Sequence, residues 1–539
     1  MSDTNASVIS RHLAATGCRH AFGMPGGEVL VLLEALRDAG IEFTLCKHEN
    51  AAGYMAEGTW HATGAPGILL TTIGPGLANG VNAVANAFQE QVAMIVLSGC
   101  IDASEAEQFT HQVIDQSALM APITKAQFRV APGTGAQVVQ KALAVAMADP
   151  PGPVHIDLPV GLAAEPATVT AISAPVQARV GWPLGGALAQ AAARLDKARN
   201  PVILAGLGAV HHGAGDAITA LARARGIPVI TTYKAKGVID ENDALCLGGH
   251  GLSPLSDKRI LPILRASDCI LLAGYDPIEM RSAWIQPWAA DVAIDLAHCD
   301  INHGMHGSAL RVVGDIAALI EQLHAALPDP AAGLAPIWQG GEPAAARAGL
   351  HDDFKGPDHW GPHAVFRALR AEMPDNAVVT VDSGAHRILL SQMLRCDRPH
   401  SLMQSTCFCT MGVAVPLAIG FTIARPETPV IAVVGDAGFD MSPGDLATLR
   451  DTGLPMAIVV LVDDALALID KKQVLMQLPG YGVRFRPTDI ASVARAYGGH
   501  GVSVEDAASF IRELNDVWSR DSFSVIAARI DKQEYASAF

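Results

Sequence analysis

Short apolar runs alternate with helical stretches and Gly-rich turns along most of this chain. In the last third, the apolar run 430–434 stops at Gly435-Asp436-Ala437-Gly438. A stretch readable as a helix follows at 445–450, and a second apolar run, 456–462, ends in Asp463-Asp464. Apolar runs of this length, bounded by Gly, Pro and Asp, predict buried strands. The order strand, helix, strand predicts a βαβ unit with carboxylates at the carboxyl ends of both strands.

The same alternation predicts the fold of the rest of the chain. Strands separated by helices favour a parallel, doubly wound sheet, so we expect an α/β protein with three such domains. Pro-rich or Ala-rich stretches at 164–185 and 328–357 are interpreted as linkers. The expected domains are therefore residues 1–165, 182–328 and 358–533. The predicted strands of the first two domains cover 41–46, 67–72, 93–98, 201–205, 228–232, 269–273 and 292–294, and the predicted helices include 51–62 and 77–88.

Composition supports a large soluble enzyme. A length of 539 residues favours about three domains. Half of the residues are hydrophobic and 17% are charged, which excludes a disordered chain. The formal net charge of −16 argues against nucleic acid and anionic membranes as partners. The nine Cys show no metal-type spacing, and no signal peptide or membrane-spanning run is evident, so we expect a cytoplasmic protein with reduced thiols.

The turn after the run 430–434 has the chemistry of a phosphate site. Ligands of open α/β sheets bind at the carboxyl ends of the strands. Backbone N–H groups of a Gly-rich turn can approach phosphate oxygens, and a nearby carboxylate can hold Mg²⁺ against the same oxygens. Gly435, Asp436, Ala437, Gly438 and Asp463 therefore predict a metal-bridged diphosphate site. The alternative is an ordinary Rossmann-like turn with two solvated acids.

The spacing resembles a motif of thiamine-diphosphate enzymes. In that motif a Gly-Asp-Gly turn is followed by a metal-binding Asn, and here Asp463 lies 27 positions after Asp436. The resemblance implies that Asp436, Asp463 and the backbone carbonyl of Ala465 bind Mg²⁺. The chain departs from the motif twice: Ala437 replaces the second Gly, and Asp463 replaces Asn. A second carboxylate beside a diphosphate is tolerable only with the cation bound.

Further segments extend the resemblance over nearly the whole chain. Residues 22–27, 48–52 and 74–80 look like the pyrimidine-binding domain of these enzymes, in the acetolactate synthase-like branch that includes pyruvate oxidase and benzaldehyde lyase. The resemblance implies that Glu49 hydrogen-bonds the aminopyrimidine and so promotes loss of the thiazolium C2 proton. Pro25 and Asn79 would contact the cofactor. Alternatively, Glu49 only complements the dipole of its helix.

Three further residues of the first domain are candidates for contact with substrate. By the resemblance, Gln112 matches a Gln beside the thiazolium and would hydrogen-bond a substrate carbonyl. His111 stands where acetolactate synthases usually carry Phe. Glu28 stands where benzaldehyde lyase has a catalytic His. His111 has a structural alternative, and Glu28 would either act as an acid or base or repel an anionic substrate.

In the third domain, the resemblance implies contacts with both ends of the cofactor. Gly384, Ala385 and His386 would contact the diphosphate, although a packing role for His386 is equally compatible with the sequence. The carbonyl of Cys409 and the N–H of Met411 would hold the aminopyrimidine edge. Met411 would also be the bulky wedge that forces the cofactor into its bent form, with core packing as the alternative.

The resemblance implies decarboxylation of a 2-oxo acid and carboligation of the resulting enamine to a carbonyl acceptor, in a homodimer or homotetramer with the cofactor at a subunit interface. The alternatives are a simple decarboxylase, an acyloin lyase and a non-catalytic regulatory homologue. FAD is weakly supported because Gly206-Leu207-Gly208 lacks a third Gly at the dinucleotide spacing. The Pro/Gly-rich stretch 477–486 is interpreted as a mobile lid.

Overall fold

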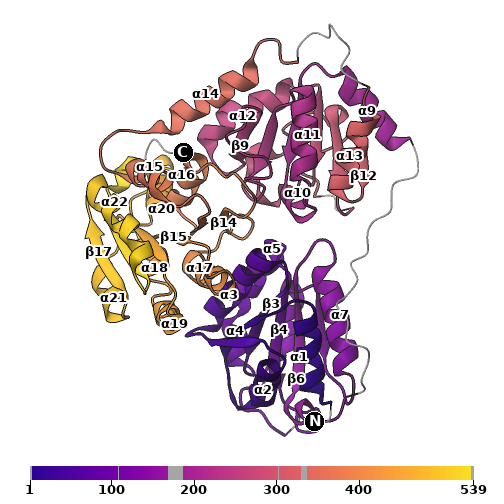
Figure 1. Cartoon of the computed structure of the whole chain (residues 1–539), viewed down its shortest axis with the longest axis vertical. Helices are drawn as coiled ribbons and strands as arrows, with labels where there is room; N and C mark the ends of the chain where they lie inside the picture. The colour runs from indigo at the N-terminus through magenta and orange to yellow at the C-terminus, as the bar shows by residue number, and fades with distance from the viewer. Residues whose placement is uncertain (1–2, 107, 168–185, 301–302, 329–336, 536–539) are drawn as a thin grey trace.

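The computed structural model describes residues 3–106, 108–167, 186–300, 303–328 and 337–535, and contains three six-stranded parallel sheets flanked by helices (Figure 1). The predicted fold class is confirmed. Each sheet consists of the short apolar runs that the sequence marks out, and most of their side chains are buried because helices cover both faces.

The first sheet has the strand order β2-β1-β3-β4-β6-β5. The chain leaves β1 toward β2 and then crosses to β3 on the other side, so the order reverses between β1 and β3. Such a reversal opens a crevice at the carboxyl ends of the two strands. The strands are β1 (His20–Met24), β2 (Glu42–Leu45), β3 (Gly67–Thr71), β4 (Met94–Cys100), β5 (Ala126–Arg129) and β6 (Pro153–Pro159). The helices include α1 (Asn5–Ala15), α2 (Leu30–Asp38), α3 (Glu49–Thr63), α4 (Pro75–Asn79), α5 (Val81–Gln89), α6 (Gln116–Met120) and α7 (Gly135–Met147).

The second sheet has the order β12-β11-β10-β7-β8-β9, which leaves β9 at the edge that lies toward the third sheet (Figure 1). Its strands are β7 (Pro201–Ala205), β8 (Val229–Thr232), β9 (Cys246–His250), β10 (Cys269–Ala273), β11 (Ala293–Ala297) and β12 (Leu310–Val313). Its main helices are α9 (Ala187–Lys197), α11 (Gly215–Arg225), α12 (Pro254–Ala266) and α13 (Ile316–Ala326).

The third sheet repeats the topology of the first, in the order β14-β13-β15-β16-β18-β17, with the reversal between β13 and β15. Its strands are β13 (Val378–Val381), β14 (Leu402–Gln404), β15 (Val430–Gly435), β16 (Ala457–Val462), β17 (His500–Val504) and β18 (Ser524–Arg529). Its helices include α15 (Pro362–Glu372), α16 (Ala385–Met393), α17 (Ala414–Ala424), α18 (Asp436–Phe439), α19 (Asp445–Thr452), α20 (Ala467–Leu475), α21 (Ile490–Ala496) and α22 (Ala507–Asp516).

The third domain shares a hydrophobic core with each of the other two. One core joins α3 and α5 of the first domain to α17 and β15 of the third, and another joins α12 of the second to α15 and β13 of the third. The first and third domains approach each other closely where α3 and α17 cross. There a Cβ on Gly420 would lie 2.0 Å from the carbonyl oxygen of Met55, and one on Gly58 would lie 2.3 Å from that of Leu417.

Two predicted elements were wrong. The second predicted linker contains the helix α14 (Glu342–Lys355), whose Leu350 and Phe354 are buried against the second and third domains. The predicted helix 77–88 is divided at Gly80 into α4 and α5. The first predicted linker, 164–185, lies mostly outside the described residues. Among the described helices, none is long and apolar enough to cross a membrane.

Candidate functional site

The carboxyl ends of β15 and β16 are joined through Asp436. This side chain is 4% exposed. Its Oδ1 accepts a hydrogen bond from the N–H of Ala437 at 2.8 Å, and its Oδ2 accepts from the N–H groups of Asp463 at 3.0 Å and Asp464 at 2.7 Å. Burial raises the pKa of Asp436 above its ordinary value. The turn after β15 and the turn after β16 therefore form one loop pair around a buried carboxylate.

The three candidate metal ligands lie in this loop pair. The N–H of Ala465 donates to Asp463 Oδ1 at 3.1 Å, so Asp463 and Ala465 are held together two residues apart. Two carboxylates and a backbone carbonyl are hard oxygen donors, which suit Mg²⁺. Among the described residues, no group of three or more His, Cys, Asp or Glu side chains is arranged to hold a metal, so a cation here needs the carbonyl as well.

The loop after β16 is also tied to the predicted lid. The N–H of Leu466 donates to the carbonyl of Val483 at 2.8 Å, and Ala465 forms an antiparallel bridge with Arg484. On its other side, Asp464 forms an ion pair with Arg529 of β18 at 3.1 Å. Because of these backbone contacts, movement of residues 477–486 would also displace the candidate metal loop.

Next to this loop, the start of α16 forms a polar cradle. His386 is 5% exposed, and its Nε2 has no hydrogen-bond partner among the described residues. The Oγ atom of Ser383 is also buried and also has no partner among them. Burial lowers the pKa of His386 to about 3, so the ring is neutral at pH 7. Cβ atoms on Gly384 and Gly435 would lie 2.5 and 3.2 Å from its Cε1. A buried polar atom without a partner is costly, and the Ser383 hydroxyl can donate to an anion bound at this helix start, whereas the neutral ring of His386 donates to the backbone of Asp382 and leaves Nε2 as an acceptor.

Asp382, which the sequence analysis gave no role, connects this cradle to the segment before α17. Its carboxylate, fully buried after β13, accepts from the N–H of Gly412 at 3.0 Å and of Val413 at 2.9 Å. Burial raises the pKa of Asp382 to about 6. A Cβ on Gly438 would lie 2.1 Å from Asp382 Oδ2, so only glycine fits at that position of the turn. The sequence did offer one indication of a role for Asp382, because this carboxylate directly follows an apolar run.

The turn that carries Cys409 and Met411 is held by residues of all three domains. Cys409 has φ +56°, and its thiol donates to the carbonyl of Thr406 at 3.1 Å. Glu90, from the first domain, accepts from the N–H groups of Cys407 at 2.9 Å and Phe408 at 3.0 Å. Lys234, from the second domain, lies 2.5 Å from the other oxygen of Glu90. The sequence analysis assigned no role to Glu90 or Lys234. The only indication in the sequence was that each is a charged residue next to an apolar segment.

In the first sheet, Glu49 and Asn79 lie together at the switch point. Glu49 is the first residue of α3 and is 5% exposed, and its Oε2 accepts from Asn79 Nδ2 at 2.9 Å. His48 caps the helix, because its Nδ1 accepts from the N–H of Asn50 at 3.1 Å. A Cβ on Gly76 would lie 3.2 Å from Glu49 Oε1. A buried carboxylate is therefore presented at the carboxyl edge of the sheet.

Glu28 lies at the same edge. It follows β1 and the half-buried Pro25, and its Oε2 accepts from Thr72 Oγ1 at 2.6 Å. Gly99, at the end of β4, makes room for it, since a Cβ there would lie 2.8 Å from Glu28 Cβ. Glu28 therefore lies beside the carboxyl ends of β1, β3 and β4, next to the crevice at the switch point of the first sheet.

Gln112 and His111 are less closely tied to this edge. Both side chains are exposed, and the ring of His111 packs edge-to-face on Phe109 with centroids 6.3 Å apart. Gln112 has φ +59° and contacts the site with its backbone: a Cβ on Gly74 (φ +61°) would lie 2.0 Å from the Gln112 carbonyl oxygen. The described contacts thus place the backbone of Gln112, rather than its side chain, against the site.

The buried glutamine of this segment is Gln116, to which sequence reasoning gave no separate role. Its Oε1 accepts from the N–H of Gly74 at 2.8 Å, and its Nε2 donates to Asp157 Oδ1 at 2.6 Å. Gln116 therefore fixes the turn after β3 to the end of β6. Its position at the start of α6, behind the Asp115 cap, was the only indication in the sequence.

Known families and relatives match most of the chain. Three family models match: the N-terminal and C-terminal TPP binding domains of thiamine pyrophosphate enzymes, at residues 3–119 and 382–528, and their central domain, at 188–323. An acetolactate synthase of Bacillus subtilis is 29% identical over 94% of this chain and 89% of its own length. The catabolic acetolactate synthase of Raoultella terrigena is 28% identical over 98% and 95%. A probable 2-ketoarginine decarboxylase of Pseudomonas aeruginosa is also 28% identical, over 98% and 94%.

Proposed function

The chain belongs to the thiamine pyrophosphate enzyme family, in its acetolactate synthase-like branch, and we propose that it decarboxylates a 2-oxo acid and joins the product to a carbonyl acceptor. The observation that carries this proposal is the buried Glu49, which accepts a hydrogen bond from Asn79 at a sheet switch point. Thiamine diphosphate, when bound, supplies the carbon nucleophile and the electron sink that side chains lack.

We assign the proton transfer to Glu49. With the cofactor bound, this carboxylate would exchange a proton with the aminopyrimidine ring; Asn79 keeps Oε2 oriented, and Oε1 faces the turn at Gly76. Burial keeps water from competing for that proton. Pro25, in the turn after β1, lines the same edge and supports the ring by contact.

The loop pair of the third sheet would hold the diphosphate together with Mg²⁺. Asp436, Asp463 and the carbonyl of Ala465 are the metal ligands in this proposal, and the backbone of Gly435, Ala437 and Gly438 approaches the phosphate oxygens. The buried hydroxyl of Ser383, which has no hydrogen-bond partner among the described residues, supports the anion's place here because it can donate to a phosphate oxygen. The acid at position 463 makes the cation essential, because without it the carboxylate and the diphosphate repel each other.

The remaining contacts orient the two ends of the cofactor and the substrate. Gly384, Ala385 and His386 would bind the diphosphate from the start of α16. The carbonyl of Cys409 and the N–H of Met411 hold the aminopyrimidine edge, in a turn fixed by Glu90 and Asp382. Met411 is half-buried, as a wedge between cofactor and core must be.

In this proposal, residues at the carboxyl edge of the first sheet select the substrate. Glu28, held by Thr72, acts on the substrate as an acid or base, and Gln112 and His111 approach it from the segment after β4. A decarboxylase that protonates its product is the second candidate. It is favoured by the relative named a probable 2-ketoarginine decarboxylase, which matches nearly the full length of the chain.

FAD is not part of this proposal. The glycines of the Gly206-Leu207-Gly208 turn are accounted for by packing within the second domain. A Cβ on Gly206 would lie 2.5 Å from the carbonyl oxygen of Gly274, and one on Gly208 would lie 2.6 Å from His298 Nδ1. These glycines therefore provide no separate support for a dinucleotide.

We propose that the enzyme is a homodimer or homotetramer. Large apolar side chains are exposed near both halves of the site: Leu30 is 56% and Ile114 45% exposed beside the first sheet, and Met441 is 60% and Phe408 40% exposed beside the third. Exposed apolar groups at a catalytic edge are typical of a surface that a second subunit covers.

The test is to follow pyruvate by NMR with purified protein, thiamine diphosphate and Mg²⁺. Acetolactate as the product establishes the carboligase, and acetaldehyde alone establishes the decarboxylase. Without turnover of pyruvate, 2-ketoarginine is the next donor to offer. We expect Glu49→Gln to lower kcat by at least 100-fold, the scale of a lost general acid or base. Glu34→Gln, at an exposed glutamate of α2, is the control for the loss of charge. Failure of the protein to bind thiamine diphosphate would contradict the proposal.

A further inference from the structure

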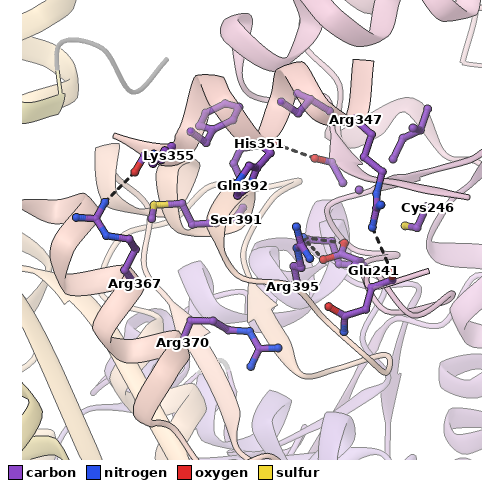
Figure 2. Close-up of a pocket in the computed structure, with 18 residues that line it drawn as sticks. Glu241, Cys246, Arg347, His351, Lys355, Arg367, Arg370, Ser391, Gln392 and Arg395 are labelled. Atoms are coloured by element: carbon purple, nitrogen blue, oxygen red, sulfur yellow. Dashed lines mark hydrogen bonds and ion pairs between the residues drawn. The ribbon is translucent and has the colours of Figure 1, made fainter. Parts of the chain in front are cut away.

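A second concave site lies between the second and third domains, on the outer side of the edge strand β9. It has a volume of about 530 Å³ and is lined by the loop between β8 and β9, by β9 itself, and by α14, α15 and α16 (Figure 2). This volume is in the range of small-molecule sites. The pocket adjoins the last turn of α16, whereas the residues proposed to bind the diphosphate are at the first turn of that helix.

The pocket is strongly cationic. Six of its lining residues are Lys or Arg, and one, Glu241, is a carboxylate. Glu241 is already neutralised, because both of its oxygens accept from Lys236 Nζ at 2.8 Å, and Oε2 also accepts from the N–H of Cys396 at 2.8 Å. Within the described residues, none of the other five cations lies within 4.0 Å of a carboxylate. These five, called here the pocket cations, are Arg347, Lys355, Arg367, Arg370 and Arg395.

Two of the pocket cations are oriented by carbonyl groups. Arg367 donates to the carbonyls of Lys355 at 2.8 Å and Pro357 at 2.7 Å, and Arg347 donates to that of Asn242 at 3.2 Å. Figure 2 shows Arg367 and Arg347 on opposite sides of the pocket, with Arg370 below. Bonds to carbonyl groups fix a guanidinium without cancelling its charge, so the pocket retains an excess of positive charge.

This excess is unusual for a chain of net charge −16 and indicates an anionic ligand. Like charges that converge on a concave site repel each other, and a bound anion offsets that repulsion. Several arginines together favour phosphate, since the planar guanidinium matches two phosphate oxygens. The wall of the pocket also contains the apolar side chains of Leu247, Leu350, Phe354 and Met393, which suit an organic moiety.

We propose that this pocket binds an organic phosphate carrying at least two phosphate groups. The phosphates contact Arg370 and Arg395, which make no side-chain hydrogen bonds to other described residues, and the organic moiety lies against Leu350 and Phe354. This assignment is independent of the proposed reaction, because it requires only binding at the opposite end of α16 from the proposed diphosphate contacts.

The experiment is isothermal titration calorimetry with ATP and with inorganic pyrophosphate as probes. The protein is first saturated with thiamine diphosphate and Mg²⁺, so that the diphosphate site of the third sheet is already filled. We expect ATP to bind, to bind at least tenfold more tightly than pyrophosphate, and to bind more weakly as salt rises. Equal affinities for the two probes would overturn the organic part of the proposal, and no heat with millimolar ATP would overturn all of it.

The site is located with variants of equal charge. Arg370→Gln with Arg395→Gln should weaken ATP binding at least tenfold, whereas Arg37→Gln with Arg512→Gln, at two exposed arginines elsewhere, should not. Unchanged affinity in the first pair would overturn the assignment. The single variant Arg395→Gln, at an exposed position, should weaken ATP binding severalfold. Because this substitution is not expected to disturb folding, it tests the site even if the double variant folds poorly. Loss of turnover with intact ATP binding would contradict the proposed reaction alone.

Discussion

At the scale of single residues, the buried Glu57 sets a pH dependence of stability. It lies in α3, where its Oε2 accepts from Asn86 Nδ2 at 2.8 Å and its Oε1 is 3.4 Å from His61 Nε2. Burial raises the pKa of Glu57 from 4.5 to about 7 and lowers that of His61 to about 3. The folded state therefore binds a proton on Glu57 that the unfolded state loses at lower pH. This contribution to stability is complete below pH 4.5 and is lost as the pH rises to 7.

Replacement of Glu57 by Gln should remove this dependence. The amide keeps the acceptor for Asn86 and has no charge to bury, so we expect similar unfolding free energies for the two proteins near pH 5. At pH 8 Glu57→Gln should be more stable by about 1–3 kcal/mol. Urea denaturation at both pH values measures the difference, with Glu34→Gln as the exposed control. A variant that is less stable than the parent at pH 8 would show that Glu57 is ionised and paired in the folded protein.

The residues that could be predicted from sequence are those with a local signal. Asp436, Asp463 and Ala465 come together because two neighbouring strands end there, and Glu49 and Asn79 follow neighbouring turns of one sheet. The roles of those residues stay predictions. Glu90 and Lys234 could not be found in this way, because each acts on a segment of another domain. Asp382 has a local signal, since it directly follows an apolar run and acts on a segment about as close in the chain as those paired partners.

At the scale of elements, the crossing of α3 and α17 depends on glycine. A Cβ on Gly420 would be 2.0 Å from a backbone oxygen of α3, and neither helix can move without disturbing the shared core. Although alanine is the better helix former by about 1 kcal/mol, we expect Gly420→Ala to lower the unfolding free energy by about 2–4 kcal/mol. Thermal and urea unfolding would measure this loss.

Gly349 of α14 provides the matched control. It is also inside a helix, but a Cβ there would lie 2.9 Å from the far end of the long Arg259 side chain, which is 45% exposed and paired with Asp353, rather than against backbone. Gly349→Ala should therefore be neutral or slightly stabilising, by less than about 1 kcal/mol. If both alanine variants behaved alike, close approach of the helices would not be the reason for Gly420.

The error at α14 has a physical cause. Residues 342–355 contain Leu350 and Phe354 as their only large apolar side chains, so the sequence lacks the continuous stripe that predicts an amphipathic helix. The helix is stabilised instead by its place between two domains, where these two side chains join a core formed by other elements. Strands were easier to predict, because full burial requires an uninterrupted apolar run whatever the neighbouring domain.

At the scale of the whole molecule, the three domains meet at one buried ion pair. Glu90 of the first domain and Lys234 of the second are both less than 10% exposed, and Glu90 holds the turn 407–408 of the third. The N–H of Lys234 also donates to Glu279 Oε1 at 3.0 Å, and Thr406 donates to the same oxygen at 2.9 Å. The turn proposed to hold the cofactor belongs to the third domain, but it is positioned by charged side chains of the first and second domains.

Removal of one partner should therefore affect folding and the cofactor turn together. Lys234→Met leaves Glu90 buried without its cation, and we expect a loss of about 3–5 kcal/mol in unfolding free energy. In Lys234→Met with Glu90→Gln, no net charge is left buried, so the double variant should recover part of that loss while binding thiamine diphosphate more weakly than the parent protein. Urea unfolding and calorimetric titration of the cofactor measure the two effects. If the two substitutions were additive in stability, Glu90 and Lys234 would not act as a pair, and the turn at Cys409 would have to be positioned by the third domain alone.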